Sequence, residues 1–98
     1  MPVKKKDYNY NYAFLFYDVN EKRVQKVFKV CKKYFKHHQK SVFRGNITPS
    51  NLIKLTAELK KIINSKEDFI SIIKLMNEDS FDEETIGTNY NDSESLIL

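Results

Sequence analysis

The apolar positions along the chain fall into runs that predict strands. Residues 12–19 are aromatic and apolar except for Asp18, a pattern typical of a buried strand. Residues 37–45 predict a second, less regular strand, and the isoleucine-rich residues 69–75 predict a third. Residues 85–87 are interpreted as a short fourth strand.

Two further stretches repeat apolar residues at spacings of three and four, which predicts amphipathic helices. The first stripe follows Asn20, the expected N-cap, and consists of Val24, Val27, Phe28, Cys31 and Phe35. The second helix is expected to start at Thr48 and Pro49, a hydroxyl cap followed by a proline at the first helical position. Its stripe consists of Leu52, Leu55, Leu59, Ile62 and Ile63.

This order of elements predicts an α+β fold of the ferredoxin-like, split βαβ type. It requires either that the second strand is bent in two or that another strand lies between Gly45 and Thr48. We expect an antiparallel sheet with both helices on one face. The predicted domain spans residues 12–87, with a flexible basic lead-in at 1–11 and an acidic tail at 88–98.

Charge is distributed unevenly along the 98 residues. The net charge is +4, but residues 1–65 carry 15 Lys or Arg against four acids, giving +11, and residues 66–98 carry two against nine, giving −7. A body this basic attracts polyanions, although a solvated surface with an acidic end is the simpler alternative. The single Cys31 allows no internal disulfide, and no apolar run predicts a secretory signal or a membrane span. A cytoplasmic location is therefore expected.

Alternation along the first strand predicts an apolar face that the two helices cannot cover. Phe14, Phe16 and Asp18 share one parity and point away from the set that contains Leu15. A twofold dimer is the commonest way to cover such a face. A twofold through that interface could bring two copies of Asp18 near each other, and paired carboxylates can hold Mg²⁺. The alternative is that Asp18 only favours the start of the following helix, and the residues alone leave both readings open.

The chain resembles the family of CRISPR-associated protein 2 in four features. They are the strand ending Tyr17-Asp18-Val19, the basic helix after it, Ser41-Val42-Phe43 with Gly45, and the Thr48-capped helix. The resemblance implies a ferredoxin-like homodimer in which Asp18 is a Mg²⁺ ligand for endonuclease cleavage of RNA or DNA. It also implies a scaffold in spacer acquisition that bridges dimers of CRISPR-associated protein 1, the integrase, and supports the DNA to be inserted. The alternative is a toxin-type ribonuclease similar to virulence-associated protein D, which shares this fold.

For nucleic-acid binding, the sequence offers cations beside the predicted interface, expected to contact phosphates without sequence preference. The candidates are Lys22, Arg23, Lys26 and Arg44. The resemblance also implies a C-terminal segment that docks on a partner, with Ile86, Leu96, Ile97 and Leu98 as the candidate contacts. His37 and His38 are the obvious titratable residues, but adjacent positions in an extended segment face opposite ways, so ordinary surface roles are the favoured interpretation.

Overall fold

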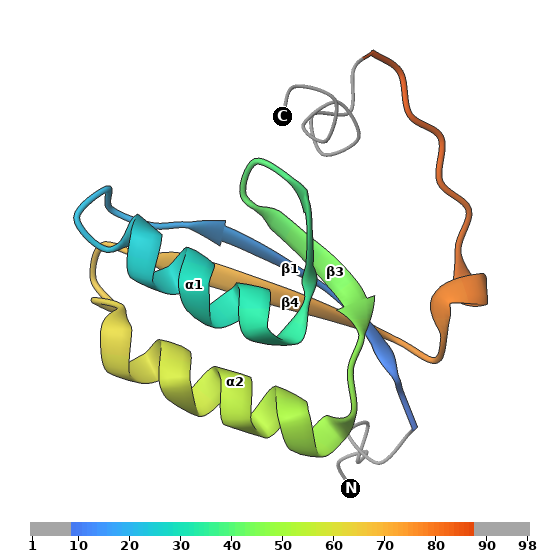
Figure 1. The fold of residues 1–98 in the computed structure, drawn as a ribbon, viewed down its shortest axis with the longest axis horizontal. Coiled ribbons are helices and arrows are strands. Elements are labelled where there is room, and N and C mark those ends of the chain that lie inside the picture. Colours follow the sequence, from blue (N-terminus) through green and yellow to red (C-terminus); the bar gives the residue numbers. More distant parts are fainter. Residues whose placement is uncertain (1–8, 88–98) are drawn as a thin grey trace, which may run out of the picture.

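The computed structural model describes residues 9–87 and contains one antiparallel sheet covered on one face by two helices (Figure 1). The strands are β1 (Tyr12–Asp18), β2 (Lys36–Gln39), β3 (Val42–Asn46) and β4 (Phe69–Leu75), in the order β2-β3-β1-β4. The helices are α1 (Val24–Tyr34) and α2 (Pro49–Ile62), and they lie side by side on the sheet. This arrangement confirms the predicted ferredoxin-like α+β fold.

The core lies between the helices and one parity of β1. Ala13 and Leu15 are fully buried, and Tyr17 is nearly so, because all three point toward α1 and α2. Leu15 pairs with Phe43 of β3 in the sheet, and Phe43 is also fully buried. The two central strands therefore present their apolar side chains to the helices, as the alternation in the sequence predicts.

The second predicted strand is bent in two, which decides between the alternatives left by the sequence. β2 and β3 form a hairpin whose turn includes Lys40 at φ +40°, a left-handed conformation uncommon for a non-glycine residue. The register shifts between His37 and Gln39, which accounts for the irregular apolar pattern there. No strand is needed between Gly45 and the second helix.

The starts of the two helices differ in how well local sequence predicts them. Thr48 caps α2 as expected, and its Oγ1 accepts a hydrogen bond from the Asn51 N–H at 3.1 Å. The prediction that Asn20 caps the first helix is wrong, because α1 begins four residues later, after Arg23. Asn20 Oδ1 instead accepts from the Lys22 N–H within a turn that precedes the helix.

The chain after β4 forms a short 3₁₀ helix, η2 (Glu78–Ser80), and then an extended segment. Residues 85–87 form no strand, so the predicted fourth short strand is wrong and the sheet ends with β4. Among residues 9–87, no helix is long and apolar enough to cross a membrane. The proposed lead-in and acidic tail fall largely outside the described residues.

Candidate functional site

The sheet face turned away from the helices, here called the open face, carries Asp18 at one end. Asp18 is the last residue of β1, is exposed, and pairs in register with Phe69 of β4. Phe14 and Phe16 lie on the same face, half-buried, with their rings stacked at 6.3 Å between centroids. Ile73, opposite Phe14, is 49% exposed and Phe69 is 60% exposed. The structure thus brings the three predicted interface residues onto one apolar face.

The segment after η2 covers the other end of the open face. The Phe81 ring lies 5.0 Å from that of Phe14 and 5.7 Å from that of Tyr12, centroid to centroid. Tyr12 is consequently buried, and its burial raises the pKa of its hydroxyl. Sequence reasoning missed this cover, although Phe81 is the one aromatic residue in an acidic stretch.

Glu83 fastens the same segment to the hairpin. Its carboxylate accepts a hydrogen bond from Arg44 Nη1 and lies 3.4 Å from His38 Nε2. The hydrogen bond from Arg44 lowers the pKa of Glu83 below its ordinary value. Arg44, a candidate phosphate contact, therefore already faces a carboxylate on its own chain.

A buried carboxylate organises the turn that follows Asp18. The Asp68 side chain is fully inaccessible and accepts hydrogen bonds from Arg23 Nε at 2.6 Å, from the Asn20 N–H at 2.9 Å and from the Asn64 N–H at 2.8 Å. The hydrogen bond from Arg23, more than any other contact, holds the pKa of Asp68 far below its usual range. Asp68 thereby ties the β1–α1 turn to the α2–β4 turn.

The four cations predicted to contact phosphates fall into two groups. Arg23 forms ion pairs with Asp68 and with Glu67, whose Oε1 lies 2.8 Å from Arg23 Nη2. Arg44 forms an ion pair with Glu83. Lys22 and Lys26 are exposed, and within residues 9–87 neither forms an ion pair. The two lysines are therefore the cations of this set most available to a polyanion.

The remaining predicted contacts lie at the end of the described chain or beyond it. Ile86 is 95% exposed, which suits a docking residue. Leu96, Ile97 and Leu98 lie outside the described residues.

Within the described residues, Asp18 belongs to no cluster of metal ligands. Between residues 9 and 87 there is no group of three or more His, Cys, Asp or Glu side chains that could hold a metal ion. The nearby Asp68 is occupied by Arg23, and His37 Nε2 lies 2.7 Å from the Lys40 carbonyl oxygen. One exposed carboxylate fits Mg²⁺, which takes one or two carboxylates with water and phosphate oxygens completing its shell.

Comparisons with known proteins agree with this architecture. Residues 11–83 match the model of the family described as CRISPR associated protein Cas2. The CRISPR-associated endoribonuclease Cas2 of Thermotoga maritima is 40% identical over 76 residues, which is 78% of this chain and 87% of that protein. A Cas2 endoribonuclease of Thermodesulfovibrio yellowstonii is also 40% identical over 76 residues, covering 78% and 86%.

Solved structures give the same result. A crystal structure of Cas2 superposes with a TM-score of 0.76 at 32% identity, covering 82% of this chain and 90% of that one. Streptococcus pyogenes Cas2 superposes with a TM-score of 0.58 at 28% identity, covering 83% and 92%. The family match decides against the alternative likeness to virulence-associated protein D. This chain belongs to the Cas2 family of CRISPR-associated proteins.

Proposed function

We propose that this Cas2 protein acts as a homodimer that binds nucleic acid in CRISPR spacer acquisition and cleaves phosphodiester bonds at Asp18 with the help of Mg²⁺. The observation that carries the proposal is the exposed Asp18 at the uncovered end of an apolar sheet face. The names of the relatives, endoribonucleases in Thermotoga maritima and Thermodesulfovibrio yellowstonii, support cleavage of RNA.

The open face supports dimer formation. Phe69 and Ile73 remain largely exposed, and Phe16 adds a half-buried ring between β3 and β4. Burying such a surface against a second copy removes apolar area from water, at about 25 cal/mol per Å² before the costs of association. A twofold axis that passes close to the Asp18 end of this face would bring the two Asp18 carboxylates together.

In this dimer Asp18 of each protomer would hold the metal ion. When bound, Mg²⁺ neutralises phosphate charge and activates a water molecule. The chain itself supplies the geometry: β1 fixes the backbone of Asp18, and the Asp68–Arg23 cluster fixes the turn that follows it. Lys22 and Lys26 would contact phosphates of the bound strand beside that turn.

The scaffold part of the proposal uses the same dimer. Its two copies present two sets of lysines, which suit a duplex that spans both protomers. Ile86 and the apolar Leu96, Ile97 and Leu98 would dock on CRISPR-associated protein 1. The exposed position of Ile86 at the end of the segment held by Phe81 and Glu83 supports this arrangement.

The decisive experiment substitutes Asp18→Asn, with Glu21→Gln as the matched control, since Glu21 is another exposed acid in the adjoining turn. We expect Asp18→Asn to abolish Mg²⁺-dependent cleavage of RNA and DNA substrates, while Glu21→Gln retains it. Both variants are also assayed for spacer integration with the partner integrase. Retained cleavage by Asp18→Asn refutes the catalytic assignment. If Asp18→Asn loses cleavage but still supports integration, the dimer acts in integration as a scaffold that does not need its cleavage activity.

The interface is tested separately by Phe16→Glu. We expect this charge on the open face to give a monomer in size-exclusion chromatography with light scattering. Ile53→Glu is the control, because Ile53 is 70% exposed on α2, away from the open face, and should leave the dimer intact. A wild-type chain that is monomeric at micromolar concentration contradicts the proposed interface.

A further inference from the structure

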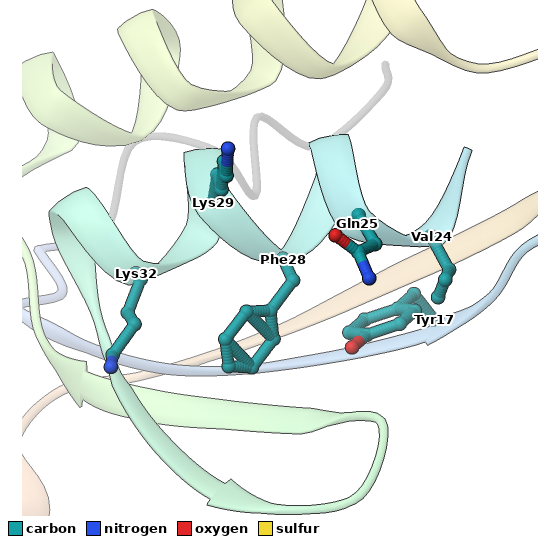
Figure 2. Close-up of a pocket in the computed structure, with 6 residues that line it drawn as sticks. All are labelled: Tyr17, Val24, Gln25, Phe28, Lys29 and Lys32. Atoms are coloured by element: carbon teal, nitrogen blue, oxygen red, sulfur yellow. The ribbon is translucent and has the colours of Figure 1, made fainter. Parts of the chain in front are cut away.

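A groove runs along α1 on the side that faces the β2–β3 hairpin, away from Asp18's open face (Figure 2). Its volume is about 580 Å³, within the range of roughly 300–1,000 Å³ typical of ligand sites. One lining residue, Tyr17, comes from β1. The others come from α1: Val24, Gln25, Phe28, Lys29 and Lys32.

The apolar wall of the groove is packed against neighbouring aromatic rings. The Phe28 ring packs against Phe43 at 5.2 Å and meets His37 edge-on at 4.9 Å, centroid to centroid. Tyr17 also stacks on Phe43, at 6.1 Å between ring centroids, and Figure 2 shows the Tyr17 ring beside Val24 and Gln25. An aromatic surface held in this way can stack on a planar ligand without losing much side-chain entropy.

The polar rim of the groove is positive. Lys32 Nζ lies 5.7 Å from the centre of the Phe28 ring, and Lys29 is exposed one turn earlier on α1. In the part of the chain that the structure describes, no carboxylate lines the groove and neither lysine forms an ion pair. Gln25, also exposed, contributes an amide that can both donate and accept hydrogen bonds.

We propose that this groove binds one unstacked base of a single-stranded nucleic acid, with the base on Phe28, its edge at Gln25 and the neighbouring phosphates at Lys29 and Lys32. The combination of an aromatic wall, one amide and two ammonium groups that form no ion pair within residues 9–87 matches the base, base edge and backbone of a nucleotide. An apolar peptide would use the wall but gain nothing from the two lysines. The inference rests on the proposed function and adds a site that prefers single strands to duplexes.

The test uses a single-stranded oligonucleotide that contains one 2-aminopurine, whose fluorescence is quenched by stacking, and the corresponding blunt duplex. Phe28→Leu keeps the apolar character of the wall but removes the aromatic face. We expect it to weaken single-strand binding by about fivefold or more, the lower end of what one stacked base contributes, and to relieve the quenching. Duplex affinity should stay unchanged.

Lys32→Gln is a second variant, because Phe28 also packs against the core and its replacement can lower stability. It is compared with Lys26→Gln, which removes the same charge from an exposed position of α1 outside the groove. Lys32→Gln should reduce single-strand affinity more than duplex affinity, and Lys26→Gln should reduce both alike.

The outcomes separate the two proposals. Equal effects of Lys32→Gln and Lys26→Gln on both substrates, with undiminished quenching in Phe28→Leu, overturn the base site alone. Binding of duplex without any binding of the single strand by the wild-type protein also overturns the base site and leaves the proposed function standing. Failure of the wild-type protein to bind either substrate overturns both.

Discussion

The ion pairs within the chain predict which cations set the salt dependence of nucleic-acid binding. The perturbation is the double variant Lys22→Gln/Lys26→Gln, which removes two exposed lysines that form no ion pair within residues 9–87. The matched control is Lys33→Gln/Arg44→Gln. It removes the same two charges, but from side chains already bound to Glu58 and Glu83.

The magnitude follows from counterion release. Each phosphate contact contributes about 0.9 to the slope of log affinity against log salt concentration on duplex DNA. A dimer that presents both lysines twice makes up to four such contacts, so the double variant should lower the slope by about 3.6. The control should lower it by less than about 0.9, because its cations would have to leave their carboxylates before they could meet a phosphate.

Fluorescence anisotropy of a labelled duplex, titrated between about 50 and 200 mM salt, measures both slopes. Comparison of the two variants removes the effect of net charge, since both lose two positive charges per chain. Equal reductions of the slope would refute the reasoning, because binding would then depend on total charge and not on which cations are free. A larger reduction in the control would assign the contacts to Lys33 and Arg44.

Three further predictions concern the folded chain. Asp68→Asn should lower the thermal midpoint at pH 7. The difference from wild type should shrink as the pH falls below about 4, because Asp68, whose pKa is lowered in the folded chain, stabilises the fold only while its carboxylate is ionised. A difference in thermal midpoint that persists unchanged in acid contradicts this. Burial raises the pKa of Cys31 to about 12, so a thiol reagent at pH 8 should label it only after unfolding in urea, and rapid labelling of the native protein would place the thiol at the surface. Leu55→Ala should lower the free energy of unfolding by about 2–5 kcal/mol in urea titrations, whereas Ile53→Ala on the exposed side of α2 should change it little.

Short-range patterns in the sequence were sufficient for most of the fold. The apolar stripes of α1 and α2 and the Thr48 cap depend on neighbours within one or two helical turns, and the structure reproduces them. The parity of Phe14, Phe16 and Asp18 likewise needs only the two-residue period of a strand. That parity predicts Asp18 on the face opposite Leu15, and in the structure Asp18 ends β1 exposed.

Two predictions were wrong, the Asn20 cap and the strand at residues 85–87. Both lie where contacts between residues far apart in the sequence fix the path of the chain. Asn20 is a residue type favoured at N-caps, but its Oδ1 accepts from the Lys22 N–H and its own N–H donates to Asp68, 48 positions later. Both bonds hold Asn20 in the turn before α1, which begins after Arg23. Residues 85–87 have strand-like composition, yet the preceding contacts of Phe81 and Glu83 direct the segment across the open face. The long-range contacts of Asp68, Phe81 and Glu83 have no signal in local sequence.

These long-range pairs also change the meaning of the charge asymmetry. The acidic last third of the chain does more than offset the basic body, because Asp68 and Glu67 neutralise Arg23, and Glu83 neutralises Arg44. The acids therefore occupy both arginines of the chain and leave exposed lysines on α1, on the turn before it and on α2. A polyanion approaching the folded chain therefore meets the exposed lysines of α1 and α2 more readily than the two arginines.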